Sequence, residues 1–333
     1  MAPKRKGQEK GKKRARLEDG QGSGVNLEPN WNIHWSNKYL FWDLVAYDNY
    51  AGLFMHRKLA ECYFFDKATV TFDQPEDDKM IEYVNHWSWN LLLTCTEPYT
   101  MLLTRIFYAN LTITDEPFVV KTWLCGQEID LSLANMAQWL ELPNEGEESY
   151  PLRNWPLQAL ESSRLYKKWF DRNNIGGSIY VSNLPSIHRL LFILINNILI
   201  PKATIKTNLE WGPMYYLRHL ISKDDKSFNI PYIILRHMGI AFNSTVALLP
   251  YAHLIHKIIR INGLPYPEEE QLYAPINLVG HLTKIGWIYG HLNSGLRCYK
   301  PDGRDINEWI NKPGVLPNQY WDPDEQQQQN PVQ

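Results

Sequence analysis

The sequence predicts a mainly α-helical protein with one small β-hairpin, a disordered basic tail at the N-terminus and a polar tail at the C-terminus. Three observations lead to this prediction. Apolar residues recur at helical spacing through much of residues 31–265. Hydrophobic residues make up 44% of the 333 residues, and 13 of them are Trp, which is enough apolar material for a folded core. The first 24 residues are instead polar, Gly-rich and aperiodic, as disordered segments are.

The predicted β-hairpin lies within residues 105–143, around which we expect the chain to be organised. A helical segment over 98–109 comes first, and two β-rich runs follow at 111–114 and 118–124. Gly126 is the predicted turn residue after them, because glycine adopts turn conformations at no steric cost. The stretch therefore predicts a helix that leads directly into a hairpin.

A compact helix is predicted over 132–140. Ser132 is placed to accept a hydrogen bond from a free backbone amide at the start of this helix. Pro143 stops the helix, since proline has no amide hydrogen to donate. Four apolar residues fall at helical spacing, so one face is predicted to pack inward. They are Leu133, Met136, Ala137 and Leu140.

Two further helical segments precede this stretch. Within residues 31–66, four residues stand at helical spacing: Trp35, Tyr39, Trp42 and Ala46. We interpret them as a core-facing side and not as a base-stacking surface, because the charges beside them are sparse and of mixed sign. The other helix is predicted over 75–93. Its buried face comprises Met80, Tyr83, Val84, Trp87 and Leu91.

The second half of the chain contains more apolar helices. The run at 190–200 is eleven residues long and includes two asparagines, whereas a helix that spans a bilayer needs about 20 apolar residues. It is therefore predicted to be a buried core helix, and no membrane association is expected. Pro213 and Pro231 suit the first turns of two more helices. A last helix within 248–264 is closed by an Asn-Gly pair.

Residues 143–156 form the best candidate for a boundary within the chain. Pro, Gly and Glu residues in this segment break regular structure, although the halves on either side can still share one core. The predicted division is a disordered basic tail (1–28), an N-terminal helical part with the hairpin (29–142), a linker (143–156), a C-terminal helical part (157–265), an irregular extension (266–312) and a disordered tail (313–333).

The N-terminal tail carries the strongest local charge. Within residues 4–16, eight Lys or Arg against one Glu give +7, so the formal net charge of −2 leaves −9 for the remainder. Clustered basic side chains suit a nuclear import carrier, and they also bind RNA or DNA phosphates by counterion release. A solvated tail without a partner is the third interpretation. The candidate residues are Lys4, Arg5 and Lys6, then Lys12, Lys13, Arg14 and Arg16.

Cysteine usage and the first acidic cluster have ordinary structural explanations. The cysteines at 62, 95, 125 and 298 are scattered, with no Cys-x-x-Cys pair and no secretory leader. Reduced, mostly buried thiols in an intracellular protein are therefore expected. Glu76, Asp77 and Asp78 fall at a predicted helix start, where carboxylates oppose the helix dipole. We favour this explanation over a divalent-metal site.

His253 and His256 lie three residues apart on a predicted helix. A zinc site needs further ligands, and no Cys is nearby, so no metal is expected. We expect both histidines to be partly exposed or hydrogen-bonded, on a solvated face with Lys257 and Arg260. The chain also lacks the phosphate-binding, dinucleotide-binding, zinc-protease and hydrolase motifs. The protein is therefore predicted to be no enzyme, without catalytic residues or a cofactor.

The organising stretch also carries a family resemblance. FYANL at 107–111 is followed by Gly126, Ile129 and Ser132, and then by LELP at 140–143. This series resembles the plant transposon protein family, which comprises gag-like or first-frame proteins of plant retrotransposons, Athila-type elements among them. No catalytic residue is attached to the series, so the resemblance implies a lineage and not a chemistry.

Four later runs are similar to the C-terminal part of the same family: ILIPKAT at 198–204, YYLRHLI at 215–221, IPYIILRHM at 230–238 and LLPYAHLIHKIIRINGL at 248–264. The resemblance thus extends over most of residues 35–265. The chain departs from the family where Leu-Pro-Tyr-Ala replaces Phe-Pro-Ser-Leu and where Ser-Lys-Asp replaces a Thr-Gly-Arg turn. A second resemblance, to the plant mobile domain proteins with their similar helix and Leu-Pro motif, stays open.

The resemblance implies a non-catalytic protein that associates with its own copies or packages element RNA. With the basic tail, it favours the nucleus, and the cytoplasm stays open as well. Two alternatives remain. A domesticated nuclear adaptor would bind another protein through an apolar groove, and a DNA transposase or nuclease would bring scattered acidic residues together in space.

Overall fold

The computed structural model describes residues 29–66, 82–85, 88–150, 186–202, 211–222, 228–267, 270–278, 281, 289–292 and 295–298. The two predicted tails, the acidic cluster at 76–78 and the second part of the predicted linker lie outside these residues.

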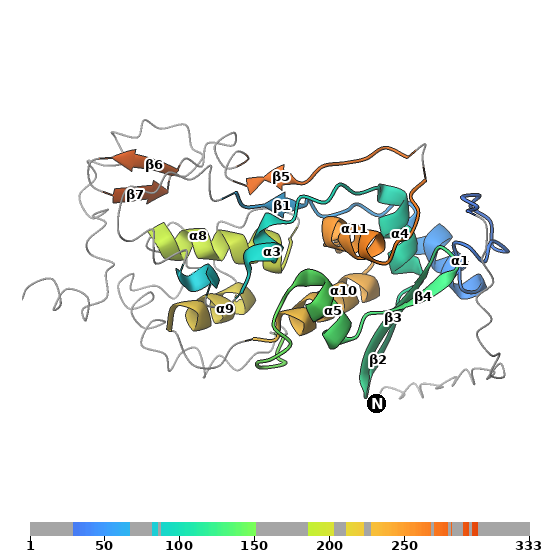
Figure 1. Cartoon of the computed structure of the whole chain (residues 1–333), viewed down its shortest axis with the longest axis horizontal. Coiled ribbons are helices and arrows are strands. Elements are labelled where there is room, and N and C mark those ends of the chain that lie inside the picture. The colour runs from blue at the N-terminus through green and yellow to red at the C-terminus, as the bar shows by residue number, and fades with distance from the viewer. Residues whose placement is uncertain are drawn as a thin grey trace, which may run out of the picture.

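About 47% of the described residues are helical and few are in strands, so the fold is mainly helical with a small antiparallel sheet, as predicted. In Figure 1, α10 and α11 lie in the middle, with the sheet and α4 on one side and α8 and α9 on the other. The helices are α1 (Leu44–Asn49), the π-helix η1 (Tyr50–Phe54), α3 (Asn90–Thr94), α4 (Met101–Ala109), α5 (Leu133–Leu140), α8 (Ser186–Leu194), the π-helix η5 (Ile195–Leu199), α9 (Trp211–Ser222), α10 (Ile230–Asn243) and α11 (Ala252–Ile261).

The antiparallel sheet contains the predicted hairpin and one more strand. Its strands are β2 (Thr112–Asp115), β3 (Phe118–Leu124) and β4 (Gln127–Asp130), in that order. Cys125 and Gly126 join β3 to β4 with φ angles of 53° and 82°, the pattern of the tight turn that matches strand twist. We did not predict β4, because Gln, Glu and Asp disfavour strands and only Ile129 of this strand is buried.

Backbone pairing joins segments that are far apart in the sequence. Strand β1 (Tyr63–Phe64) pairs with β5 (Ile276–Asn277), and Leu59 forms a parallel bridge with Leu249. Tyr99 and Tyr273 exchange both backbone hydrogen bonds, at 2.8 and 2.9 Å. Residues 266–312 were predicted to be irregular, yet they contain β5 and the hairpin of β6 (Tyr289–Leu292) with β7 (Gly295–Cys298).

The buried side chains form one hydrophobic core cluster that includes residues from both sides of the predicted linker. Leu103 and Met136 come from the first half, and Leu191 and Ile255 from the second; each has 1% exposure or less. The described part of the linker is itself attached to this core, because Glu147 bridges to Phe228 and Tyr150 packs against it. The two halves of the described chain therefore share one core.

Several predicted helix boundaries are confirmed. The side chain of Ser132 accepts a hydrogen bond from the amide of Asn135 at the start of α5, and three of the four predicted inward residues are fully buried. Pro231 occupies the first turn of α10, and Gly263 follows α11 with a φ of 65°. Helix α9 begins two residues before Pro213. The run at 190–200 is buried throughout and forms α8 and η5.

The predicted core face of the first helix is wrong for two of its four residues. Tyr39 and Ala46 are buried, but Trp35 is 53% and Trp42 52% exposed. The reason is local, because polar side chains near 37–43 bind the backbone and delay the helix. The amide of Asn37 donates to two earlier carbonyls, at 2.9 and 2.6 Å, so the helix begins only at Leu44.

The predicted helix at 75–93 is interrupted where the structure describes it. Residues 82–85 are helical, but Ser88 has a φ of 54° and α3 starts only at Asn90. A residue in the left-handed region ends a right-handed helix. Val84 is buried as predicted, and Trp89, which we did not predict, is buried with it.

The FYANL run forms the buried end of α4. All five residues have 4% exposure or less. The hydroxyl of Tyr108 donates to the carbonyl of Pro250 at 2.9 Å, and the hydroxyl of Thr122 on β3 donates to the carbonyl of Phe107 at 2.8 Å. The run is thus bonded to both the sheet and the loop before α11.

Asn110 closes α4 and holds the N-terminal segment against it. Its amide nitrogen donates to the carbonyl of Leu40 at 2.8 Å and to that of Ile106 at 2.9 Å. Its amide oxygen accepts from the backbone N–H of Trp42 at 2.9 Å. One buried side chain therefore satisfies the carbonyl of Leu40 and the N–H of Trp42, which would cost free energy if they were left unpaired. The carbonyl of Ile106 also accepts from the backbone N–H of Asn110 at 3.1 Å.

We expect Asn110→Ala to lower the free energy of unfolding by about 3 kcal/mol, because it leaves buried backbone groups without partners. Urea denaturation followed by Trp fluorescence measures this change. The control is Asn243→Ala at the exposed end of α10, which should change stability by less than about 0.5 kcal/mol. Equal effects of the two substitutions would contradict the assigned role of Asn110.

Candidate interaction surface

All the predicted import or phosphate-binding residues lie within 4–16, outside the residues that the structure describes. They are Lys4, Arg5, Lys6, Lys12, Lys13, Arg14 and Arg16. Among the side chains of the described body, acidic ones outnumber basic ones. A phosphate backbone would therefore find little general attraction there.

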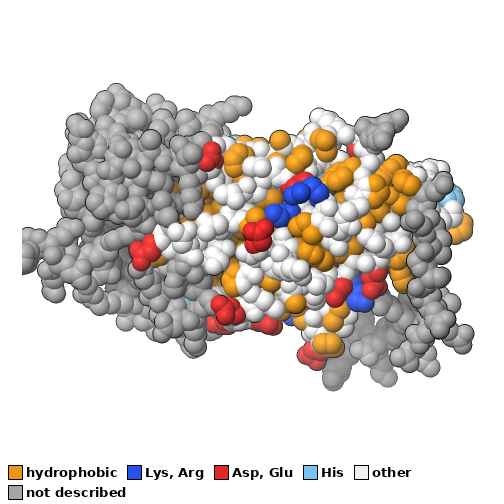
Figure 2. All heavy atoms as spheres, viewed as in Figure 1, with side chains coloured by type: hydrophobic (Ala, Val, Ile, Leu, Met, Phe, Trp, Pro, Cys, Tyr) orange, Lys and Arg blue, Asp and Glu red, His pale blue; other side chains and the backbone are white. Residues whose placement is uncertain are grey.

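Basic side chains of the body are engaged in internal contacts. Arg57 is 8% exposed and donates to the carbonyls of Ala241 and Ala247 at 2.6 and 2.8 Å. Arg236 pairs with Asp115, and Arg260 pairs with Glu97 at 2.8 Å. On the face drawn in Figure 2, basic side chains lie beside acidic ones and form no continuous basic patch.

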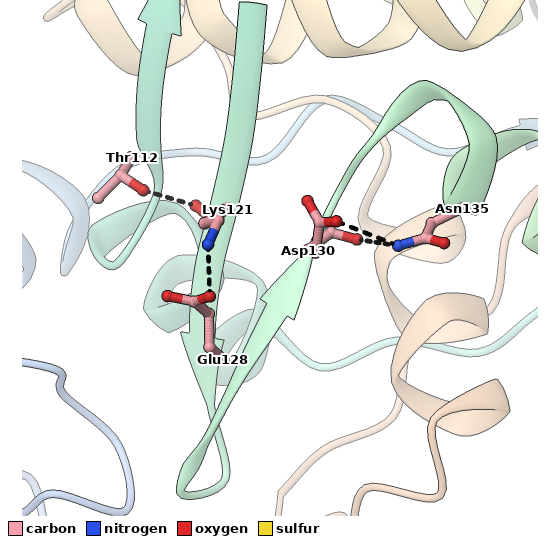
Figure 3. Close-up of polar contacts among 5 residues, drawn as sticks. All are labelled: Thr112, Lys121, Glu128, Asp130 and Asn135. Carbon is pink, nitrogen blue, oxygen red and sulfur yellow. Dashed lines mark hydrogen bonds and ion pairs between the residues drawn. The ribbon is translucent and has the colours of Figure 1, made fainter. Parts of the chain in front are cut away.

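The exposed face of the sheet shows the same pairing of charges. Lys121 on β3 contacts Glu128 on β4 at 2.7 Å, and Thr112 on β2 donates to the carbonyl of Lys121 at 3.3 Å (Figure 3). Asn135 donates to the backbone carbonyl of Asp130 at 2.9 Å and so ties the start of α5 to the end of β4. These contacts organise the sheet and leave no cluster of free cations on it.

His253 and His256 are buried, at 2% and 0% exposure, so their predicted place on a solvated face is wrong. Nδ1–H of His256 donates to the carbonyl of Ala252 at 2.9 Å, and its Nε2 accepts from the amide of Thr100 at 2.9 Å. Neither ring nitrogen of His253 has a hydrogen-bond partner among the described residues. Helical spacing gives no signal of this burial, because His253 and His256 lie on the same side of α11 as Lys257 and Arg260.

Burial keeps these histidines neutral. Desolvation lowers the pKa of His253 to about 3, with the neighbouring His256 adding to the effect, and lowers the pKa of His256 to about 4. His237 on α10 is similar. It lies between the hydroxyl of Tyr150 and the carbonyl of Pro201, and desolvation lowers its pKa to about 4. In the part of the chain that the structure describes, no group of three or more His, Cys, Asp or Glu is placed to hold a metal ion.

The thiols of Cys62 and Cys95 are free and buried, as predicted for them, and that of Cys125 is half-buried. Burial raises the pKa of Cys62 to about 12, an effect that the backbone amides at the start of α11 partly offset. Burial likewise raises the pKa of Cys125 to about 11. A thiol that stays protonated is a poor nucleophile. These cysteines are packing residues.

The one feature of the described body that calls for a partner is apolar. We define the α1 surface as Trp42, Leu44, Val45 and Leu53, whose exposures are 52%, 54%, 62% and 49%. Single exposed apolar side chains are common on protein surfaces, but four large ones within twelve residues are a cluster. Hydrophobic side chains are also visible over the α4 and α1 end of the molecule in Figure 2.

Trp42 is held rigidly in this surface. Its ring meets that of Trp123 on β3 at a centroid distance of 4.8 Å and an angle of 72°. Its backbone N–H is bound by Asn110, and its carbonyl accepts from Lys38 at 2.9 Å. The indole N–H of Trp123 in turn donates to the carbonyl of Lys38 at 2.8 Å. An exposed Trp that is already ordered pays little entropy on binding, which suits an interface anchor.

One local feature of the sequence does indicate the α1 surface. Asp43 is a favourable N-cap residue, and its side chain does accept from the amide of Ala46 at 2.8 Å. A helix capped there excludes Trp42 from its apolar face. The periodic spacing of aromatic residues points the other way and predicts Trp42 in the core.

Comparison of the chain with protein-family models, with curated proteins and with solved structures returns no match. None of the described helices has the length and apolar character needed to cross a membrane.

We expect the unfolding free energy to fall as the pH drops from about 6.5 toward 5. The unfolded chain takes up protons on His237, His253 and His256 near pH 6.5, whereas the folded chain does not until about pH 4. Each histidine contributes up to about 1.4 kcal/mol per pH unit to this slope. The three together contribute up to about 4 kcal/mol per pH unit.

Urea denaturation at several pH values measures this slope. His253→Met, which sacrifices no hydrogen bond, should reduce the slope by about one third. Val246→Met, at an exposed position without a titratable group, is the control and should leave the slope unchanged. A slope that His253→Met does not change would show that His253 is protonated equally in the folded and unfolded chains.

Proposed function

We propose that this chain is a non-catalytic, gag-like structural protein of plant retroelement origin, which binds its own copies through its folded body and nucleic acid through its basic tail. The observation that carries the proposal is the rigid, exposed α1 surface. Every other distinctive group described above, whether histidine, cysteine or arginine, is buried or bonded within the chain. Contact with another macromolecule is the use that such a body supports.

The distribution of charge supports a division of labour. The tail holds +7 and the remainder −9, so long-range attraction for phosphates is concentrated at 4–16. Binding by counterion release reads no sequence, which suits a protein that coats RNA. The same basic clusters suit import into the nucleus, where we place the protein.

The family resemblance supports a structural role in a specific way. The residues of FYANL lie in the core, and Tyr108 and Asn110 bond three separate segments together. The LELP run ends α5, with Leu140 and Leu142 buried. Within this chain, the FYANL run and the two leucines of the LELP run therefore help to maintain the fold.

A domesticated nuclear adaptor is the second candidate, and the same α1 surface favours it. The two roles differ in what they require of the chain. An assembly protein must associate with itself and must hold nucleic acid, whereas an adaptor needs neither property.

We expect the full-length protein to bind single-stranded RNA with a steep salt dependence that resides in the tail. The test variant replaces seven residues by Gln: Lys4, Arg5, Lys6, Lys12, Lys13, Arg14 and Arg16. It should lose most of the affinity and reduce the slope of log K against log salt by up to about 5, since each phosphate contact on a single strand contributes about 0.7. Filter binding between about 50 and 200 mM salt measures both quantities.

The matched control replaces exposed basic residues of the body, Lys58 and Lys121, by Gln and should retain the affinity of the unmodified chain. If the unmodified protein binds no RNA at low salt, the packaging role fails. If it binds but the tail variant binds equally well, the assignment to the tail fails.

A further inference from the structure

We infer that the α1 surface is the contact between two copies of this chain, related by a two-fold axis. The inference rests on the proposed self-association and adds to it the location and symmetry of the contact. Three observations carry it: the apolar side chains that define the surface, a glycine among them without any internal role, and charges of both signs at the edge.

The apolar part is suited to the centre of an interface. Trp42, Leu44, Val45 and Leu53 together leave about half of their side-chain surface in water. Trp is strongly enriched among the residues that dominate binding, and Trp42 is fixed beforehand by Trp123 and Asn110. Covering these four side chains removes apolar area from water without ordering new segments.

Gly52 lies in η1, between these apolar side chains in the sequence. Glycine within a helix is unfavourable relative to alanine. Nothing lies within 4 Å of the position that a Cβ at Gly52 would take, and no positive φ requires glycine there. Gly239 is different, because a Cβ there would meet Ile113 Cδ1 at 3.1 Å. The space above Gly52 is outside the described body, which is where the backbone of a second helix could approach closely.

The charges beside the surface distinguish a second copy from nucleic acid. Lys38 and Asp48 are exposed, and Asp43 is half-buried at the start of α1. A surface that carries both signs is complementary to itself across a two-fold axis, where Lys38 of one copy faces the acidic residues of the other. A phosphate backbone would instead meet two carboxylates and one ammonium group. These charges favour a second copy of the chain over nucleic acid as the occupant.

Sedimentation equilibrium on the full-length protein tests the inference with three single variants. Val45→Asp places a charge in each half of the contact, and we expect it to raise the dimer dissociation constant at least about a hundredfold. Gly52→Ala keeps all internal contacts and should raise the constant about tenfold, while its thermal unfolding midpoint stays equal or rises. Val246→Asp is the matched control, because Val246 is 90% exposed but lies outside the α1 surface, and it should dimerise like the unmodified chain.

Circular dichroism of each variant establishes that the fold is intact. If the unmodified chain dimerises and Val45→Asp and Val246→Asp dimerise equally well, the assigned contact is wrong although self-association stands. If Val45→Asp dissociates the dimer but Gly52→Ala does not, the close helix approach at Gly52 is wrong. If the unmodified chain is a monomer at every concentration, both this inference and the proposed self-association are wrong.

Discussion

The structure depends on one buried amide. Asn110 stands where α4 ends and the sheet begins, and it bonds three backbone groups from two segments. Because it holds Trp42, it also determines where the chain turns outward before α1. Asn110 thus joins the exposed Trp42 to the buried FYANL run. The position of Trp42 at the surface is therefore fixed by its hydrogen bond to Asn110 at the buried end of α4.

Several other polar side chains inside the core also bond to backbone groups. Asn196 and Asn197, in the middle of an apolar run, donate to carbonyls one turn earlier at 2.8 and 2.7 Å, so their burial leaves the helix bonded. His256 bridges the start of α4 to α11, and His237 bridges Tyr150 to the end of η5. Buried polar groups that are paired specify one arrangement of the elements. Both ring nitrogens of His253 lack a partner among the described residues, and the cost of burying this ring increases in acid.

Much of the fold could be predicted from local signals. Ser132, Pro231 and the Asn-Gly pair after α11 mark helix ends whatever the rest of the chain does, since capping is local chemistry. The errors came where periodicity was ambiguous. Trp35 and Trp42 fit a helical stripe, but the side chains of Asn37 and Asp43 hold the backbone outside a helix.

The remaining features depend on contacts that a sequence does not display. Nothing in Tyr63 or Ile276 indicates that they pair across the whole molecule, and β4 contains residues with poor strand propensity. The candidate surface was missed for a related reason. Aromatic residues at helical spacing are usually buried, which outweighs the local signal at Asp43, and the contact of Trp42 with Trp123 has no signal in the sequence. The charge of the basic tail, in contrast, is plain from the sequence, because it needs no fold to be recognised.

The pairing of β1 with β5 has a consequence for how this protein is made. Residues 58–64 bond to partners at 249 and 276, and Tyr99 bonds to Tyr273. During translation these early segments wait for about 200 residues to leave the ribosome, at roughly 5–20 residues per second. Through that interval the hydroxyl of Tyr108 in α4 lacks its partner, the carbonyl of Pro250, and long-range pairing of this kind is slow and prone to aggregation. A chaperone that holds the nascent chain until β5 emerges would prevent this aggregation. The yield of folded protein in a cell should therefore depend on the supply of chaperones as well as on the stability of the folded state.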